Sequence, residues 1–328
     1  MLEGEEMKIL HICAGWQHWN GAANIARMIM DEQRREGHEV SFATWAKIRD
    51  LKAADEVWIH CGWLPCLWWA AFWAKNARWM PEACYDPIRL KFSAWKKRLA
   101  GPIERWSLRR CKKLVATCDA EKAWIEAYLG KKCPEIVVED VKRFYNLKWE
   151  KGSGKWEKGR ECGEVDSNNK KLNVLYLGRR HPLKGVKYLE KAVDEINDDS
   201  RSRESKLNSG IGNFSNEENL SVHCSTSTSN FDAKKIDLRI VSGAKGEELE
   251  KVWEWCDVLV LPTLSENFGL VVAEALERGK RVITTDGAPV WGDGNDYDGR
   301  LMYLKGYREG SDEARIKLLR DTLMLIVG

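Results

Sequence analysis

Four charged side chains stand at spacings that suit the binding of anions and hydroxyl groups. Arg179 and Lys184 are five residues apart in the turn GRRHPLKG (178–185), directly after the apolar run LNVLYL. A planar guanidinium and a compact ammonium on one turn suit a diphosphate. Glu266 and Glu274 are eight apart in PTLSENFGLVVAEALERGK (262–280), and carboxylates accept hydrogen bonds from hydroxyls. Together they predict a site for a ligand with a diphosphate and a polyol.

The second pair requires a helix that follows a buried strand. The run VLVLP ends before TLSENFG, and we expect Ser265 or Asn267 to cap a helix that begins near Phe268. Its free N–H groups would attract an anion, and Gly269 would permit close approach. Glu274 would then lie about two turns inside, roughly 12 Å along the axis, among apolar neighbours. The competing interpretations are a solvated basic turn, a capping Glu266 and an exposed helical Glu274.

Strands alternate with helices along both halves of the chain, which predicts α/β architecture with mainly parallel sheets. The expected segments include strands at 8–13, 39–44 and 55–60, and again at 172–178, 237–242, 258–262 and 281–285. We predict an N-terminal Rossmann-like domain over 7–150, a polar linker over 151–171 and a C-terminal Rossmann-like domain over 172–308. A polar segment at 197–236 is expected to be a mobile surface insertion. Residues 309–328 are expected to form a helix that can pack back on the N-terminal domain.

Composition narrows the class of protein. The 328 residues carry 53 basic and 50 acidic side chains, a net charge of +3, so bulk nucleic-acid binding is not indicated. The ten cysteines include no CxxC pair, and the start MLEGEEMKIL has neither the basic nor the apolar region of a signal peptide. The apolar window WLPCLWWAAFW (63–73) is shorter than the roughly 20 residues of a membrane span. A cytoplasmic protein with reduced thiols is the prediction.

Three segments resemble glycosyltransferase family 4, the retaining enzymes of the GT-B fold. PTLSENFGLVVAEALERGKRVITTDGAP looks like the E-x7-E signature of that family, and LYLGRRHPLKG looks like its G-R-x-x-x-x-K-G diphosphate motif. The opening MKILHICAGWQHWNGAANIARMIMDEQRREGHEV resembles its glycine loop and first two strands. The resemblance implies two Rossmann-like domains that face each other across a cleft. Within the family, the sequence is similar to bacterial lipopolysaccharide and exopolysaccharide glycosyltransferases.

The resemblance also implies roles for individual residues. Arg179 and Lys184 would bind the donor diphosphate and stabilise its growing charge, and Glu266 would hold the hydroxyls of the donor sugar. The ribose would bind to Glu274. The remaining donor-binding positions would be Asn20, Gly21, Gly178, Asn267, Phe268 and Gly269, and the acceptor or sugar region would include His60 and Glu82. No metal or other cofactor is expected, because cations and helix N-termini do the work of Mg²⁺.

The chain departs from the family in PEACYDPIRL (81–90). Glu82 and Ala83 stand where relatives carry a basic residue and a glycine, which indicates an altered acceptor or a weak or inactive enzyme. A sugar-nucleotide-binding protein without turnover therefore remains an alternative. A nicotinamide-dependent oxidoreductase is a second alternative, but CAGWQHWNGAANIA lacks the G-x-G-x-x-G spacing that it needs.

The segment RLKFSAWKKRLAGPIERWSLRRCKK (89–113) combines cations with apolar residues. It holds ten basic residues and a single acidic one, Glu104, and Gly101-Pro102 is expected to divide it into two helices. One interpretation is a surface helix pair whose apolar residues pack on the sheet. The other is a peripheral contact with the anionic inner face of the cytoplasmic membrane. Such a contact would bring the protein to a lipid-linked acceptor, whereas a soluble glycan acceptor needs none.

Overall fold

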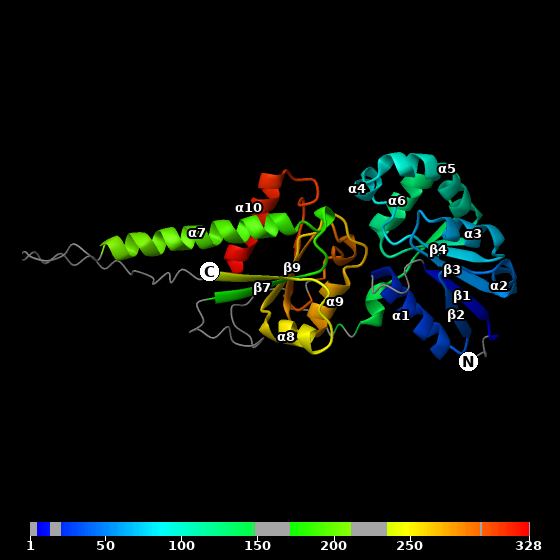
Figure 1. Ribbon diagram of the computed structural model, residues 1–328, viewed down its shortest axis with the longest axis horizontal. Coiled ribbons are helices and arrows are strands. Elements are labelled where there is room, and N and C mark those ends of the chain that lie inside the picture. The colour runs from blue at the N-terminus through cyan, green and yellow to red at the C-terminus, as the bar shows by residue number, and fades with distance from the viewer. Residues whose placement is uncertain are drawn as a thin grey trace, which may run out of the picture.

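The computed structural model describes residues 5–13, 21–145, 147, 171–210, 235–295 and 297–327, with backbone alone for 203–210. These residues form two lobes, each built on a parallel sheet covered by helices (Figure 1). The chain passes from the first lobe to the second once. Asn20, most of the predicted linker and residues 211–234 of the predicted insertion lie outside the described residues.

The first lobe contains six parallel strands in the order β2-β1-β3-β4-β5-β6. They are β1 (Lys8–Cys13), β2 (Glu39–Ala43), β3 (Glu56–His60), β4 (Ala77–Met80), β5 (Lys113–Ala116) and β6 (Glu135–Val138). The helices are α1 (Gly21–Arg35), α2 (Ile48–Ala53), α3 (Pro65–Trp73), α4 (Pro87–Lys91), α5 (Ala94–Arg110) and α6 (Asp119–Leu129). Nearly continuous burial of β1 and β3 is what a sheet covered on both faces requires.

Helix α5 corrects one expectation. Pro102 lies inside it, and the helix is continuous from Ala94 to Arg110 instead of being divided at Gly101-Pro102. Proline removes one helical hydrogen bond, but buried Glu104 and Leu108 anchor the following turns to the lobe. Tertiary packing therefore overrides the local tendency of the chain to break.

The second lobe contains five described parallel strands in the order β11-β10-β9-β7-β8. They are β7 (Lys171–Leu177), β8 (Lys235–Val241), β9 (Val258–Leu261), β10 (Arg281–Thr285) and β11 (Leu301–Leu304). The helices are α7 (Val186–Gly210), α8 (Glu247–Trp255), α9 (Leu270–Glu277) and α10 (Asp312–Val327), and short 3₁₀ turns are η2 (Pro182–Lys184) and η3 (Pro289–Trp291). A further 3₁₀ turn, η1 (Val141–Phe144), follows β6 at the end of the first lobe. The segment 197–202, predicted as part of an insertion, is helical and belongs to α7.

Helix α10 packs along α7 in the second lobe, not on the first lobe (Figure 1). Asp312 accepts hydrogen bonds from Lys187 Nζ at 2.8 Å and from Tyr188 Oη at 2.7 Å, and Arg320 pairs with Glu195 at 3.2 Å. The apolar residues Ile316, Leu319 and Leu323 of α10 are buried. The expectation that 309–328 packs back on the N-terminal domain is therefore wrong, because this apolar stripe is already covered by α7.

Strand order reverses at one point in each sheet. In the first sheet the chain moves from β1 outward to β2 and then returns to β3, and in the second it moves from β7 to β8 and returns to β9. Parallel sheets bind ligands beyond the carboxyl ends of the strands at such points. In the second lobe that edge carries the turn after β7 and the turn after β9, which hold the two predicted pairs.

Candidate active site

The turn after β7 docks directly on the turn after β9. Leu183 O accepts hydrogen bonds from Leu264 N at 2.7 Å and from Thr263 Oγ1 at 3.0 Å. Gly185 makes this contact possible, because a Cβ atom there would lie 1.9 Å from Pro262 O and the residue has φ of +66°. The docking brings Lys184 Nζ into an ion pair with Glu266 Oε2. The sequence predicted both residues but not their direct contact.

Glu266 is ionised and held by cations. Burial alone would raise the pKa of this carboxyl, but the charge and hydrogen bond of Lys184, with the charge of Arg89, outweigh it and lower the pKa. The Glu266 carboxylate also accepts a hydrogen bond from Asn267 N at 3.1 Å. An ionised acceptor at this position can receive hydrogen bonds from ligand hydroxyls.

Arg179 lies on the same rim with its side chain exposed. Its carbonyl accepts a hydrogen bond from Tyr176 Oη at 2.9 Å, which fixes the backbone just after Gly178. The pKa of His181 is lowered, first by burial and then by the charges of Arg179, Lys184 and Arg89. The charges of Arg179, Lys184 and Arg89 thus all act on His181, and Glu266 is the carboxylate that pairs with Lys184. The rim carries an excess of positive charge, as an anion site requires.

Helix α9 begins differently from the prediction. Its N-cap is Gly269, with φ of +73°, and no side chain caps it. Ser265 is instead turned away and contacts Asp86, while Asn267 contacts Thr117 across the lobes. The expected capping role of Ser265 and Asn267 is therefore wrong, and the first N–H groups of α9 are left without a side-chain partner.

Phe268 and Glu274 take different places along this segment. Phe268 is buried between the rings of Tyr145 and Trp291, at centroid distances of 5.5 Å and 5.2 Å, so it can offer a ligand only its backbone. Glu274 is half-buried on α9, and burial raises its pKa. The pKa of Tyr145 is raised first by burial and next by the charge of Glu274, so the two side chains are neighbours.

Gly21 is the first residue of α1 and faces the second lobe. A Cβ atom on Gly21 would lie 3.8 Å from Leu270 Cδ1, the first residue of α9. The N-termini of α1 and α9 therefore approach each other from opposite lobes. Helix N-termini favour anions, so this approach is consistent with the predicted diphosphate position.

His60 and Glu82 are buried inside the first lobe in a chain of polar side chains. Gln33 Oε1 lies 2.8 Å from His11 Nε2, His11 Nδ1 lies 3.0 Å from His60 Nε2, and His60 Nδ1 lies 3.2 Å from Glu82 Oε1. Burial lowers the pKa of each histidine to about 3 and raises the pKa of Glu82 to about 8. Both residues lie at the site-facing ends of β3 and β4, but their side chains are occupied by this chain.

The protonation of Glu82 follows from hydrogen-bond accounting. If Gln33 Oε1 accepts from His11 Nε2–H, then neutral His11 must accept at Nδ1 from His60 Nε2–H. The remaining nitrogen of His60, Nδ1, then carries no proton and needs a donor. Protonated Glu82 supplies it. Glu82 and Ala83 both have positive φ, +56° and +59°, so Ala83 adopts the conformation that a glycine favours.

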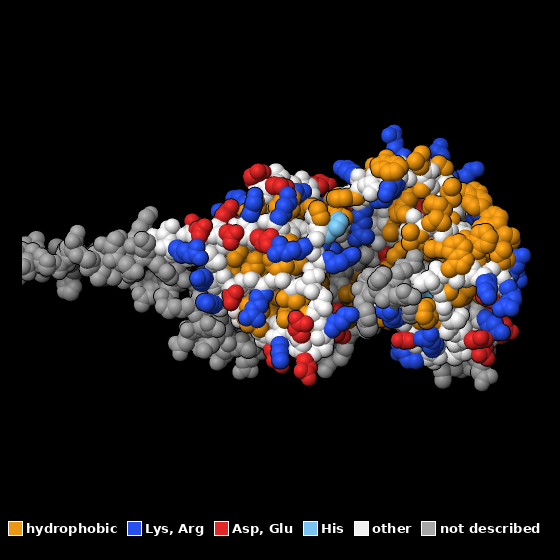
Figure 2. Space-filling model, in the orientation of Figure 1, with side chains coloured by type: hydrophobic (Ala, Val, Ile, Leu, Met, Phe, Trp, Pro, Cys, Tyr) orange, Lys and Arg blue, Asp and Glu red, His pale blue; other side chains and the backbone are white. Residues whose placement is uncertain are grey.

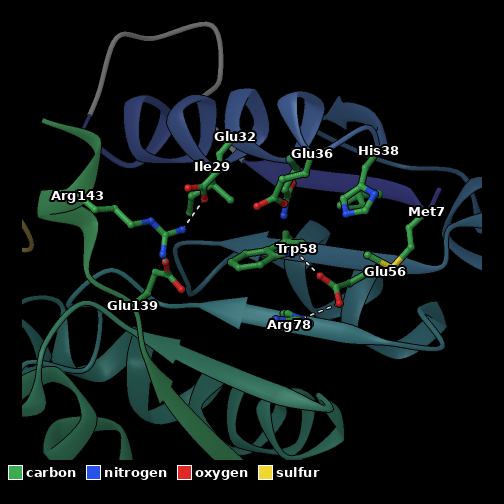
Figure 3. A pocket seen from close by; sticks show the side chains of 12 residues that line it. Met7, Ile29, Glu32, Glu36, His38, Glu56, Trp58, Arg78, Glu139 and Arg143 are labelled. Atoms are coloured by element: carbon green, nitrogen blue, oxygen red, sulfur yellow. Dashed lines mark hydrogen bonds and ion pairs between the residues drawn. The ribbon is translucent and has the colours of Figure 1, made fainter. Parts of the chain in front are cut away.

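Two cavities lie away from this rim. The first, of about 210 Å³, is bounded by α1 and the sheet of the first lobe, with Trp58 at its centre and Glu32, Glu139 and Arg143 paired at one side (Figure 3). The second, of about 280 Å³, is lined by residues of 140–147 and 293–297. Arg179, Lys184 and Glu266 line neither of them. Within the described residues, no three His, Cys, Asp or Glu side chains gather in a way that could hold a metal ion.

Sequence reasoning missed three residues at the lobe boundary. Arg89 of α4 donates from Nε to Ser265 Oγ at 2.9 Å, and Asp86 accepts from the same hydroxyl. Tyr145 stacks on Phe268. No motif pointed to them, although Asp86 and Arg89 belong to segment 81–90, where the chain departs from the family pattern.

Part of the chain, including most of the second lobe, is similar to a known protein family. Residues 160–293 match the family model of glycosyl transferases group 1. An uncharacterised 41.2 kDa protein in the cps region of Klebsiella pneumoniae is 25% identical over 194 residues, which is 58% of this chain and 48% of that protein. The chain thus matches about half the length of this curated relative.

Solved structures resemble the whole chain at low identity. The sucrose-phosphate synthase of Thermosynechococcus elongatus has a TM-score of 0.60 at 13% identity, covering 97% of this chain and 90% of that one. The structure of the Anabaena protein HepE in complex with UDP and glucose has a TM-score of 0.54 at 14% identity, with the same coverage of both chains. A glycosyltransferase from Rickettsia africae has a TM-score of 0.50 at 13% identity, and the match covers 99% of this chain and 98% of that one.

These likenesses confirm the predicted fold class, two Rossmann-like α/β lobes. The family match lies on the half of the chain that holds Arg179, Lys184, Glu266 and Glu274. The chain therefore has the GT-B fold of known glycosyltransferases, and its residues 160–293 match the group 1 glycosyl transferases.

Proposed function

We propose that this protein is a retaining glycosyltransferase of the family 4 type, which moves a sugar from a nucleotide diphosphate donor to a glycan or lipid-linked acceptor. The observation that supports it most is the turn that carries the cations Arg179 and Lys184 beside a single paired carboxylate, Glu266. Cations there suit a diphosphate and the carboxylate suits sugar hydroxyls. Its position beyond the point where strand order reverses is where such a ligand binds.

The mechanism follows from this arrangement. The bond between the anomeric carbon and the diphosphate oxygen breaks through an oxocarbenium-like state, and the acceptor hydroxyl forms the new bond on the same face. Arg179, Lys184 and the N-terminus of α9 stabilise the departing diphosphate. The Lys184 ammonium has three donors, so it can hold Glu266 and a phosphate oxygen together. The acceptor proton goes to a diphosphate oxygen, and no metal is required by this scheme.

A thermal-shift screen tests the donor site. UDP-, GDP- and ADP-sugars are each added to the wild-type protein and to Arg179→Ala. A ligand at 100 times its Kd stabilises the folded state by about 2.7 kcal/mol, so the matching nucleotide should raise Tm by several degrees in the wild type only. A shift of equal size in Arg179→Ala, or no shift with any nucleotide, would oppose the proposed site.

Retention is tested by NMR of the product. The anomeric proton coupling of the transferred sugar is compared with that of the donor. The same anomeric configuration supports the proposal, and inversion contradicts it. Binding without any turnover would favour the second candidate, a sugar-nucleotide-binding protein, for which the neutral and internally bonded Glu82 is the specific observation.

The proposal includes an acceptor carried by an anionic membrane. The outer side of α3–α5 exposes six large apolar side chains, which we name the aromatic face: Phe72, Phe92, Trp95, Leu99, Ile103 and Trp106. Trp95 and Leu99 are 65% and 73% exposed, and apolar side chains gather over the upper part of the first lobe (Figure 2). Exposed cations adjoin it at Lys91, Lys96, Arg98 and Arg110.

Two further contacts support this placement. Glu104, the single carboxylate of 89–113, is fully buried and accepts from Trp63 N at 3.0 Å and Tyr85 Oη at 2.5 Å, so the outer side keeps only positive charge. Phe92 lies 5.9 Å from His181, centroid to centroid, which connects the aromatic face to the cationic rim. Cations with interfacial aromatic residues suit an anionic lipid surface. Among the described helices, none is both long and apolar enough to cross a bilayer.

A further inference from the structure

Both chain neighbours of Glu266 are held by the opposite lobe. Ser265, which precedes Glu266, contacts Arg89 of α4 and Asp86 directly before that helix. Asn267, which follows Glu266, contacts Thr117 directly after β5. Helix α4 lies on the side of the first lobe that faces the second (Figure 1). The turn that carries Glu266 is thus gripped on each side.

The grip on Ser265 uses both functions of its hydroxyl. Ser265 Oγ donates to Asp86 Oδ2 and accepts from Arg89 Nε at 2.9 Å. Asp86 and Ser265 are fully buried, and the other Asp86 oxygen pairs with Arg308 of the second lobe. Asp86 Oδ1 also accepts from Ile88 N at 2.8 Å. A buried carboxylate needs such hydrogen-bond and ion-pair partners, so Asp86 keeps all of them only in this arrangement of the two lobes.

The grip on Asn267 rests on a second buried carboxylate. Thr117 Oγ1 lies 3.1 Å from the side-chain amide of Asn267. Because Glu121 takes the single proton of this hydroxyl, the Asn267 amide must present its Nδ2 donor to it. Glu121 Oε2 accepts from Thr117 N and Thr117 Oγ1, each at 2.7 Å, and its other oxygen accepts from Ala83 N in the positive-φ turn. The first lobe therefore presents a rigid receptor for residues 265–267.

We propose that Asp86, Arg89 and Thr117 are positioning residues that set the Glu266 carboxylate for transfer through the contact between the two lobes. They act through Ser265 and Asn267 and need not touch the donor. This inference rests on the proposed function for the role of Glu266, but the grip itself can be measured without turnover. A displacement of about 1 Å in a positioned group can reduce a rate by about 100-fold, so the effect is large enough to detect.

The experiment compares two variants that remove contacts to Ser265, which we call the clamp variants, with two matched controls. Ser265→Ala removes the gripped hydroxyl, and Ser107→Ala removes an equally buried hydroxyl in α5. Arg89→Met removes the guanidinium at the boundary, and Arg105→Met removes a half-buried guanidinium that lies over Tyr128. Steady-state kinetics and hydrogen exchange of peptides that cover 262–270 are measured for all four.

The proposal predicts that kcat falls by about 10- to 100-fold in the clamp variants, while donor KM changes less than about threefold because Arg179 and Lys184 remain. Hydrogen exchange of 262–270 should increase in both, and the controls should match the wild type. Arg89→Lys keeps one donor for Ser265 and should recover part of kcat. Unchanged exchange and kcat in Ser265→Ala and Arg89→Met would overturn the proposal.

The two readouts separate this inference from the proposed function. If no nucleotide sugar is turned over by the wild-type protein, the proposed function fails, yet the exchange data still decide the grip. Faster exchange at 262–270 in Ser265→Ala but not in Ser107→Ala then supports it. Equal exchange in both variants overturns it.

Discussion

Single residues show how environment decides the chemical form of a predicted site residue. Glu266 and Glu82 are both glutamates near the lobe boundary, and the sequence placed both in the site. Lys184 and Arg89 keep Glu266 ionised, whereas the neutral histidine chain and burial keep Glu82 protonated. Residue type and spacing predicted the positions of these carboxyls, but their charge depends on partners that come from distant segments.

The protonated state of Glu82 has a consequence for stability. Its pKa is about 8 in the folded protein and 4.5 as the ordinary value, so the folded state binds more protons between these limits. Stability from this group is therefore lost as pH rises. Between pH 6.5 and 8 we expect Glu82 to remove roughly 1.5 kcal/mol of stability, which appears as the difference between the wild type and Glu82→Gln, because the amide stays neutral.

Urea denaturation at pH 6.5, 7.0, 7.5 and 8.0 measures this effect. His11 and His60, with pKa values lowered to about 3 from 6.5, are neutral in the folded protein but half protonated in the unfolded chain at pH 6.5. Together they add about 0.8 kcal/mol of stability between pH 6.5 and 8. This gain is common to the wild type and Glu82→Gln, so it cancels in the difference between them. Glu126→Gln, an exposed change on α6, is the control and should follow the wild type. A wild-type curve parallel to that of Glu82→Gln would show that Glu82 is ionised in the folded protein.

Elements were predicted best where apolar periodicity and glycine agreed. Strands β1, β3, β9 and β10 lie within about two residues of the expected ranges. The misses concern contacts between elements. The predicted cap of α9 was wrong because Ser265 bonds to the other lobe. The predicted position of α10 was wrong because α7 covers the apolar stripe of this helix. A propensity read along one segment contains no information about the segment that packs on it.

Gly185 tests the docking of the two turns. Alanine at 185 would need φ of +66° and would place Cβ 1.9 Å from Pro262 O, so the Lys184 turn must move away from Glu266. The control is Gly243→Ala, where φ is +80° but no heavy atom lies within 4 Å. Positive φ alone costs an alanine about 1 kcal/mol. We expect Gly185→Ala to lose at least about 1 kcal/mol more in the free energy of unfolding, measured with urea. Equal losses would mean that the turns do not require this close approach.

At the scale of the whole molecule, the sequence predicted two facing α/β lobes and the edge at which we propose that a ligand binds. It did not predict how the lobes meet. The contacts that join them connect residues 86 and 265, 117 and 267, and 142 and 290, each pair more than 140 positions apart. Pairings at that distance depend on the completed fold, and no local pattern encodes them.

Vesicle binding tests the aromatic face. The triple variant Lys91→Gln, Lys96→Gln and Arg98→Gln is compared with Lys191→Gln, Lys251→Gln and Lys305→Gln, which removes the same charge from exposed sites of the second lobe. Each basic residue near an anionic surface contributes about 1 kcal/mol, so the first triple should weaken binding to anionic vesicles by on the order of 100-fold at low salt.

Co-sedimentation with anionic and with neutral vesicles gives the result. Trp95→Ser with Leu99→Ser should also weaken binding, and Leu325→Ser, an exposed change on α10, should not. Equal binding to both kinds of vesicle, or equal losses of binding in the two triple variants, would contradict a membrane surface at α3–α5. The acceptor would then be a soluble glycan.

The most direct test of the account is nucleotide-sugar turnover with the rim residues changed one at a time. Release of nucleoside diphosphate is measured with UDP-, GDP- and ADP-sugars and pooled acceptors, for the wild type and for Arg179→Ala, Lys184→Ala and Glu266→Gln, with the exposed Lys191→Ala as control. The account predicts that one donor is consumed, that each rim variant loses on the order of 100-fold or more in kcat/KM, and that the control is unaffected. Near-normal turnover in all three rim variants would contradict it.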